Sequence, residues 1–427
     1  MDAVEIQPIT RPFNATVQLP GSKSYTNRAL LIAALARSES TITDALASDD
    51  TRYMLTALRA LGVTIEEPDL HTYVVTGAGG PFPATEGELF IGNAGTAARF
   101  LTAALTLGQG TFALDGSEAM RKRPIEPLLD GLRQLGADIV SRFENGCPPV
   151  DIRASGLAGG RALMRGDISS QYFSALLMAA PYAASDVEVA VDGDLVSAPY
   201  VTMTLSTMAE FGVRAERDGN ATFHVPAGQH YEGRTYAVEP DASAASYFFT
   251  AAAVTGSRVV VPRLGSRSAQ GDLGILGVLE EMGCRVVIGE DAIEVEGPPQ
   301  LRGVDADFTQ MGDVATSLMA IAPFADGPTT VRGIAQTHYE ESDRPVAAAT
   351  ELRRMGIEVE DDWDSVTIQP GMPQPAEIET YEDHRIAMSF AVTGLRAPGI
   401  RITNPGTTAK TFPEYFDVLR EVTSSAT

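Results

Sequence analysis

The 427-residue chain carries 32 basic and 56 acidic residues, which gives a formal net charge of −24. This balance disfavours nucleic acid and anionic membranes as partners, so an anionic ligand would need a local basic pocket. A chain of this length also exceeds a single hydrophobic core, and two domains are expected.

Cysteine and histidine usage argues against disulfides and metal. Cys147 and Cys284 lie far apart without a CxxC motif, and the five histidines never approach ligand spacing. The segment MDAVEIQPIT lacks the apolar core of a signal peptide, and no window approaches 18 uninterrupted apolar residues. We therefore expect no metal, no membrane segment and a reducing cytoplasm as the compartment.

Lysine is almost absent. The chain has 29 arginines but only Lys23, Lys122 and Lys410, each in a polar motif that opens or leads into a predicted helix. Lysine is normally common on soluble domains, so the remaining ones are candidates for chemistry. For Lys122, which abuts two arginines, chance survival is an equally good explanation.

In chain order, a helix of small apolar residues recurs six times, as ALLIAAL, RFLTAAL, ALLMAAP, YFFTAAA, SLMAIAP and SFAVTGL. Intervals of 70 to 76 residues separate the anchors of these helices, which predicts six structural units over nearly the whole chain. The anchors are Leu30, Phe100, Leu176, Phe248, Leu318 and Phe390. These helices are apolar nearly all round and should be buried.

A second signature follows each of the first five helices. It is an amphipathic helix closed by glycine and followed by strand residues: ALRALGVTIEE, GLRQLGADIV, TMAEFGVRAE, VLEEMGCRVV and ELRRMGIEVE. The segment EYFDVLREV supplies the sixth amphipathic helix. Each unit thus alternates helix and strand, which predicts an α/β protein with two domains of three units each.

The segment before each buried helix is polar and differs between units: GSKSYTNR, GNAGTA, GDISSQ, PDASAAS, QMGDVAT and YEDHR. Helix starts offer free N–H groups and a positive dipole end, which suit phosphate and carboxylate. If the repeats aim these starts at one cleft, they form an anion site. The simpler alternative, that Ser, Asp and Asn here only cap helices, leaves the neighbouring Lys, Arg, Gln and His unexplained.

The ordered motifs are highly specific as a series. They are LPGSKSYTNRALLIAALA (19–36), GNAGTAARF (92–100), RKRP (121–124), GDISSQ (166–171), DLVSAPY (194–200), ESDR (341–344), YEDHR (381–385) and TAKTFPEYF (408–416). The first lacks the GxxxxGK[ST] spacing of a nucleotide P-loop. The series resembles the enolpyruvyl transferases, most closely their shikimate-pathway branch, over essentially the whole chain.

The resemblance implies a two-domain inside-out α/β barrel of six βαβαββ repeats. Domain 1 would comprise residues 1–20 and 238–427, with acid/base groups and the phosphoenolpyruvate clamps. Domain 2 would comprise residues 21–237, with most shikimate 3-phosphate contacts. The resemblance also implies a double crossover near Pro20-Gly21 and Val238-Asp241, and an active site in the cleft between the domains.

The implied reaction transfers the enolpyruvyl group of phosphoenolpyruvate to the 5-hydroxyl of shikimate 3-phosphate, on the route to chorismate and aromatic amino acids. A tetrahedral intermediate forms and then loses phosphate, without metal or cofactor. Such chemistry needs anion clamps and an acid/base pair. We expect small-molecule substrates, competition by glyphosate, and a monomer.

The resemblance assigns roles residue by residue. The catalytic residues would be Lys23, Asp313 and Glu341. Shikimate 3-phosphate would bind Lys23, Ser24, Arg28, Ser169, Ser170, Gln171, Ser197, Tyr200, Asp313, Gln336 and Glu340. Phosphoenolpyruvate would bind Lys23, Gly95, Thr96, Arg123, Gln171, Arg344, Arg385 and Lys410.

Simpler readings exist for some of these residues. Arg28 and Arg385 could be snorkelling helix arginines, Asp313 only an N-cap, and Tyr200 part of the core. By itself, Glu341 in its acidic run would be read as solvated surface.

Three departures from the family pattern matter. Before ESDR the family normally has an Arg-x-Lys run, but this chain has His338 and Glu340. A carboxylate at that point should repel both substrates. Gln336 replaces a more usual Asn, and Phe100 stands where many relatives have Pro or Leu.

Two alternative functions remain. The UDP-N-acetylglucosamine enolpyruvyl transferases share the fold, but they typically carry a reactive Cys in the loop that here reads DGSEAMRKRP. A non-catalytic homologue that binds phosphorylated metabolites is supported only by Glu340.

The charge of −24 together with the loss of lysine suggests a protein kept soluble in concentrated salt. We predict that the melting temperature rises with KCl, because the Debye length falls from about 30 Å at 0.01 M to about 3 Å at 1 M and screens self-repulsion. A neutral osmolyte serves as the control. A melting temperature that stays flat or falls with KCl would remove this inference.

Overall fold

The computed structural model describes residues 3–426. The chain folds as two compact units: a first unit of Met1–Pro20 with Glu239–Thr427, and a second unit of Gly21–Val238. The later boundary lies one residue beyond the expected position. Val238 stays with the second unit because its N–H donates to the Thr43 carbonyl at 2.9 Å.

One repeat shows the pattern in full. It contains β6 (Glu86–Phe90), α3 (Gly95–Leu105), β7 (Gln109–Asp115), α4 (Glu126–Gln134), β8 (Asp138–Ser141) and β9 (Val150–Ser155). The sheet order is β6-β7-β9-β8, in which β6 and β7 are parallel and the other pairs antiparallel. This is the predicted βαβαββ order.

Two more repeats complete the second unit. One contains β10 (Gly160–Arg165), α5 (Ser170–Ala179), β11 (Val187–Asp192), α6 (Ala198–Glu210), β12 (Glu216–Asp218) and β13 (Thr222–Val225). The other contains α1 (Lys23–Leu35), β3 (Glu39–Thr43), α2 (Asp49–Ala60), β4 (Thr64–Asp69), β5 (Thr72–Thr76) and β14 (Thr235–Ala237).

The first unit repeats the pattern. One repeat contains β2 (Asn14–Thr16), α7 (Ala242–Thr255), β15 (Arg258–Pro262), α8 (Ile275–Glu281), β16 (Arg285–Ile288) and β17 (Ala292–Glu296). The next contains β18 (Asp305–Asp307), α9 (Ala315–Ile321), β19 (Thr329–Arg332), α10 (Arg344–Arg354), β20 (Val359–Asp361) and β21 (Ser365–Ile368). The last contains β22 (Ala376–Ile378), α11 (His384–Gly394), β23 (Ile400–Thr403), α12 (Tyr415–Thr423) and β1 (Ala3–Glu5).

Two of the repeats take their first strand from a distant part of the sequence. Strand β2 pairs in parallel with β15, and strand β14 pairs in parallel with β3. The chain therefore leaves the first unit after β2 and returns to it after β14. This exchange makes the first unit discontinuous in sequence.

The sixth repeat departs from the expected βαβαββ pattern. Its sheet has three strands, in the order β1-β23-β22, with β1 antiparallel to β23. After β23 the described chain continues into α12 and reaches residue 426 without a closing hairpin. Strand β1 instead covers the edge that such a hairpin would pair.

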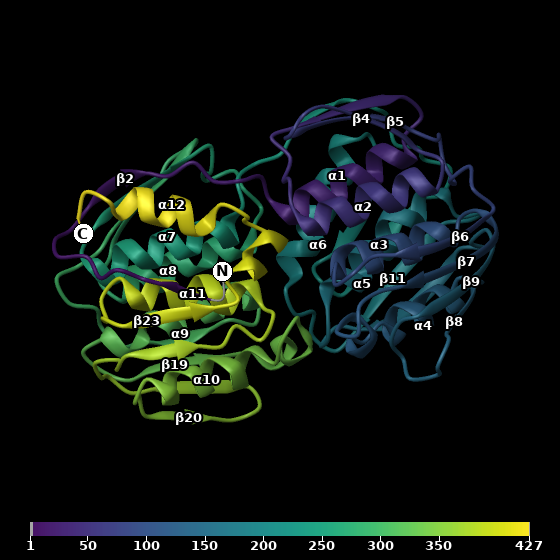
Figure 1. Ribbon diagram of the computed structural model, residues 1–427. Helices are drawn as coiled ribbons and strands as arrows, with labels where there is room; N and C mark the ends of the chain where they lie inside the picture. Colours follow the sequence, from purple (N-terminus) through teal and green to yellow (C-terminus); the bar gives the residue numbers. More distant parts are fainter. Residues whose placement is uncertain (1–2, 427) are drawn as a thin grey trace. The chain divides into compact units, whose positions relative to one another are not determined.

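The six small-residue helices form the cores, as the sequence predicts. All six anchor residues, Leu30 to Phe390, are fully buried. Helices α7, α9 and α11 pack together in the first unit, with strands such as β15, β19 and β23 against them (Figure 1). The α/β class with six small mixed sheets is therefore confirmed.

Glycines end the amphipathic helices where the pattern places them. Gly62, Gly136, Gly212, Gly283 and Gly356 have φ angles between 78° and 103°. This left-handed region is open to glycine without steric cost, so each helix can end and turn back into a strand.

Candidate active site

Arg344 is the centre of a charge network in the first unit. It begins α10, and its side chain is 3% exposed. The guanidinium donates to Asp313 at 2.9 Å, to Glu341 at 2.5 Å and to Asp383 at 2.9 Å. Burial lowers the pKa of Arg344, but the three carboxylates outweigh it and raise the pKa above the ordinary arginine value.

Two further cations extend this network. Arg385 in the first turn of α11 donates to the second oxygen of Asp313 at 2.6 Å. Lys410, at the end of the 3-10 helix Pro405–Lys410, donates to Glu341 at 2.5 Å. Asp313 and Glu341 thus each join two cations. The sequence-predicted residues Asp313, Glu341, Arg344, Arg385 and Lys410 form one connected cluster.

Asp383 is a member of the cluster that the sequence analysis missed. Its side chain is fully buried, caps α11 by accepting from the Arg385 N–H, and accepts from Ser342 at 3.0 Å. The YEDHR motif contains Asp383, but an aspartate before a helix is usually only an N-cap. Its second partner, Arg344, lies 39 residues earlier and is not visible in the sequence.

A buried Ser243–Asp272 pair adjoins the cluster. Ser243, in the first turn of α7, donates to Asp272 and lies 3.4 Å from Arg385. Burial, and then the negative charge of Asp313, raise the pKa of Asp272 to about 6. Neither residue was identified from the sequence.

Gln336 and Glu340 flank the cluster on the segment before α10. Gln336 is buried within the 3-10 helix Ala335–Tyr339 and donates to the Gly333 carbonyl at 3.1 Å. Glu340 follows that helix in an extended conformation and is partly exposed.

In the second unit, Lys23 opens α1 with its side chain 13% exposed. Its ammonium lies 3.7 Å from the buried carboxylate of Asp50, in the first turn of α2. Asp50 was not identified from the sequence, where it is one of two aspartates after a helix-capping serine.

Arg28, one turn further along α1, is almost completely buried. Its guanidinium donates to Thr204 at 2.8 Å, to Ser174 at 3.2 Å and to the carbonyls of Ser24 and Tyr200. It also lies 5.2 Å from the centre of the Phe100 ring. Burial lowers the pKa of Arg28 to about 10, so it stays charged at neutral pH.

The start of α3 combines a glycine with two arginines. A Cβ at Gly95 would lie 2.9 Å from Nη1 of both Arg123 and Arg99. Arg99 also donates to the Pro124 carbonyl at 2.9 Å, which ties α3 to the RKRP segment. Glycine therefore lets the guanidinium groups approach the helix start. The sequence analysis had identified Arg123 but not Arg99.

The remaining expected residues also lie at helix starts of the second unit. Ser169 caps α5 by accepting from the Gln171 N–H at 3.3 Å, and Ser170 is the first residue of that helix. Ser197 precedes α6 with a φ of 51°, Tyr200 lies in the first turn of that helix, and Thr96 is buried in the first turn of α3. The predicted ligands thus separate into two sets, one in each unit.

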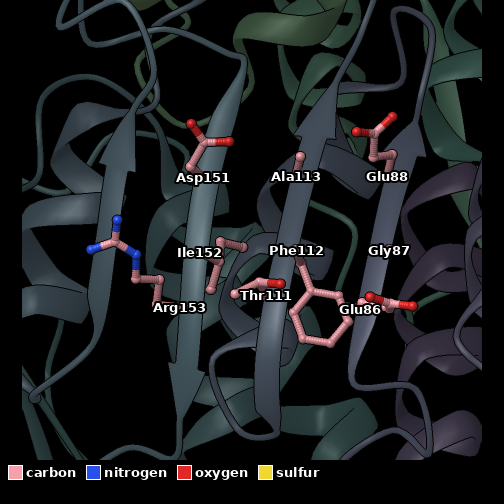
Figure 2. A pocket seen from close by; sticks show the side chains of 9 residues that line it. All are labelled: Glu86, Gly87, Glu88, Thr111, Phe112, Ala113, Asp151, Ile152 and Arg153. Atoms are coloured by element: carbon pink, nitrogen blue, oxygen red, sulfur yellow. The ribbon is translucent and has the colours of Figure 1, made fainter.

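A surface hollow of the second unit contains none of these residues. It lies on the face of β6, β7 and β9 and has a volume of about 590 Å³ (Figure 2). Glu86, Glu88 and Asp151 line it together with Arg153. Three carboxylates and one guanidinium make this hollow a poor site for a polyanionic ligand.

Among residues 3–426, no group of three or more His, Cys, Asp or Glu side chains is arranged to hold a metal ion. Within the same range, no helix is both long and apolar enough to cross a lipid bilayer.

The fold and the cluster together define the class. Six small mixed sheets around buried helices, with cations and carboxylates at the helix starts, are the arrangement that the sequence motifs led us to expect of an enolpyruvyl transferase. The EPSP synthase (3-phosphoshikimate 1-carboxyvinyltransferase) family matches residues 8–419, and the chain belongs to this family.

Individual relatives support this family assignment. The 3-phosphoshikimate 1-carboxyvinyltransferase of Trichormus variabilis is 50% identical over 417 residues, which cover 97% of this chain and 98% of the relative. The chloroplastic enzyme of Arabidopsis thaliana is 46% identical, with coverage of 98% and 84%. The EPSP synthase structure from Acinetobacter baumannii superposes with a TM-score of 0.81 at 28% identity, covering 99% of this chain and 97% of that one.

Asp272 provides a test of the buried electrostatics. The pKa of Asp272 is raised from 3.8 to about 6 in the folded state. Such a carboxyl stabilises the fold at pH values below its unfolded-state pKa, and this contribution is lost as pH rises through about 6. We predict that the wild type loses this stability as pH rises from 4 to 7 and that Asp272→Asn does not. The free energy of unfolding of Asp272→Asn should therefore increase, relative to that of the wild type, by on the order of 2 to 3 kcal/mol over this pH range.

Urea denaturation followed by circular dichroism would measure this difference. Glu281→Gln, at an exposed site on α8 of the same unit, is the control. A stability difference between Asp272→Asn and the wild type that did not change with pH would contradict the assignment.

Proposed function

We propose that this chain catalyses the reaction for which its family is named. It transfers the enolpyruvyl group of phosphoenolpyruvate to the 5-hydroxyl of shikimate 3-phosphate and releases phosphate, as a step of aromatic amino acid biosynthesis. The observation that carries the proposal is the cluster in which Asp313 and Glu341 each join two cations. Such a cluster combines anion binding with proton transfer.

The cations are the proposed phosphoenolpyruvate clamp. Arg344 and Arg385 lie at the starts of α10 and α11, and Lys410 lies at the end of a 3-10 helix. The three cations meet at two shared carboxylates. A phosphate or carboxylate group of the substrate would bind to guanidinium and ammonium groups that the fold already holds in place. In the second unit, Arg123 and the N–H groups around Gly95 and Thr96 are the proposed additional ligands.

The carboxylates are the proposed acid/base groups. The 5-hydroxyl must lose its proton as its oxygen bonds to C2 of phosphoenolpyruvate, and C3 must gain a proton. The tetrahedral intermediate then returns the C3 proton to a base as the bond to phosphate breaks. Asp313 and Glu341 suit these transfers because each is held by two cations, so neither needs to move when its charge changes.

Shikimate 3-phosphate is the proposed ligand of the polar helix starts of the second unit. These are Lys23, Ser24, Arg28, Ser169, Ser170, Gln171, Ser197 and Tyr200. Four of the five N–H donors of Arg28 are already used by protein oxygens, which leaves one on Nη1. Arg28 would therefore mainly hold α1 to α5 and α6, and Lys23 would supply the charge that meets the ligand.

We further propose that Asp313, Gln336 and Glu340 of the first unit act on the same ligand, so that both units contribute to one reaction. The protein would act as a monomer in the cytoplasm. The thiols of Cys147 and Cys284 are both free, which is the usual state in a reducing compartment.

Lys23 provides the direct test of the proposed function. We predict that Lys23→Met lowers the rate of phosphate release from the two substrates at least about 100-fold, because loss of one preorganised donor to developing charge typically costs that much. Lys122→Met removes an exposed lysine of the same unit and should retain wild-type turnover. A coupled phosphate assay measures both, and near-normal turnover of Lys23→Met would contradict the role given to Lys23.

Glu340 tests the departure from the family pattern. We predict that Glu340→Lys tightens shikimate 3-phosphate binding and raises kcat/KM at neutral pH, because it replaces a repulsion by an attraction. A tenfold gain would correspond to about 1.4 kcal/mol and should be largest at low salt. Calorimetry with Glu340→Gln as the neutral intermediate measures it. Loss of activity in Glu340→Lys would show an active role for the carboxylate.

A further inference from the structure

His338 has no role in the proposed reaction, yet its side chain is closely packed. Its imidazole is 6% exposed and stacks on the indole of Trp363, with ring centroids 4.0 Å apart and planes 8° from parallel. Trp363 lies in the turn between β20 and β21 and is the single tryptophan of the sequence. Tyr339 approaches the same indole edge-on at 6.2 Å.

Both ring nitrogens of His338 face oxygen acceptors. Nδ1 lies 2.7 Å from Oδ1 of Asp343, and Nε2 lies 2.8 Å from the main-chain carbonyl of Trp363. A neutral imidazole has one donor and one acceptor nitrogen, so it would turn a lone pair toward one of these oxygens. Only the doubly protonated ring donates to both, and an aromatic face beneath it suits a cation.

The acceptor Asp343 connects His338 to the catalytic cluster. The same Oδ1 accepts from the Val346 N–H at 3.3 Å and so caps α10. The first residue of α10 is Arg344, which holds Asp313, Glu341 and Asp383. The orientation of the Asp343 carboxylate therefore bears on the helix turn from which Arg344 projects.

Hydrogen bonds also hold the β20–β21 turn that carries Trp363. Asp364, next to Trp363, accepts from the Ala335 N–H at 2.9 Å, and Asp362 accepts from the Asp364 N–H at 3.0 Å. Asp343, the N-cap of α10, contacts His338 directly. Asp362 and Asp364 lie on either side of Trp363 in the β20–β21 turn, and Glu340 lies two residues after His338 in the chain. Each of these groups is acidic.

We infer that His338, as an imidazolium stacked on Trp363, is a positioning residue that holds Asp343 as the cap of α10 and thereby fixes Arg344 in its carboxylate network. It supplies a cation where the family pattern normally has an arginine. The catalytic consequence rests on the proposed function, whereas the protonation state and the stacking do not.

The single tryptophan gives a direct measurement on the full chain without substrate. A protonated imidazole in contact with an excited indole accepts an electron from it and quenches its emission, whereas the neutral ring quenches far less. We expect the Trp363 emission to rise as pH is raised through loss of the imidazole proton. His338→Gln and His338→Arg should abolish this transition. His224→Gln, which changes a partly exposed histidine of the second unit, should leave it unchanged.

Asp343→Asn is the second variant, for the event that a change at His338 prevents folding. Asparagine also caps helices well but carries no charge. The Trp363 emission at neutral pH should then be stronger than in the wild type, because the imidazolium that quenches it has lost its negative partner.

Kinetics distinguish a positioning role from a merely structural one. His338→Gln should raise KM for phosphoenolpyruvate about tenfold, which corresponds to about 1.4 kcal/mol. The KM for shikimate 3-phosphate should change little, because Arg344 belongs to the proposed phosphoenolpyruvate clamp. His338→Arg should restore the KM for phosphoenolpyruvate to within about twofold of the wild-type value. Because the charge of arginine is permanent, this KM should not rise with pH in His338→Arg.

The inference is overturned if the emission transition persists in His338→Gln, or if His338→Arg is as impaired as His338→Gln. A wild-type protein without phosphate release would overturn the proposed function instead, and the emission titration would still decide the state of His338.

Discussion

The buried guanidinium of Arg344 is the interaction on which the first unit's cluster depends. A charge removed from water is stable only when opposite charges and hydrogen bonds replace the lost hydration. Here Asp313, Glu341 and Asp383 do so from three separate helix starts. Loss of the arginine would leave three carboxylates facing one another in a poorly hydrated space. The arrangement therefore fixes the relative positions of these helix starts, and it keeps both proposed acid/base groups and their cations in place before substrate arrives.

The repeats explain how such a cluster can be built from a nearly uniform scaffold. Each buried helix is made of small apolar residues and packs against its equivalents, so α7, α9 and α11 lie together within the first unit. Packing constrains the apolar faces but not the residue just before each helix. Those starts can therefore differ, and they carry Ser243, Asp313 and Asp383 in the first unit. Helix dipoles add to the attraction for anions at the same points.

The ion pairs on the protein surface differ from those in the cluster around Arg344. Many arginines form ion pairs with exposed carboxylates, such as Arg142 with Asp151 and Arg332 with Asp305, and each of these contributes little to stability. Arg344 is instead buried and joined to three carboxylates. His338, which stacks on Trp363, lies between these cases. It contacts Asp343, the N-cap of α10, and it borders a turn with an exposed indole. The partners of its ring nitrogens come from the neighbouring loops rather than from the packed core.

The sequence by itself determined the periodic features of this protein. The spacing of apolar helices predicted six units and their buried anchors, and the glycines marked where helices end, because both depend on local geometry that a 70-residue period exposes. The motifs also placed Asp313, Glu341, Arg344, Arg385 and Lys410 in one functional set. Only the tertiary structure revealed which strands, β2 and β14, complete the repeats at the expected crossover, the three-stranded sixth sheet, and the parts played by Asp383 and Asp272. Those features depend on which distant segments pack side by side, and an aspartate before a helix looks the same in sequence whether it caps that helix or neutralises an arginine far along the chain.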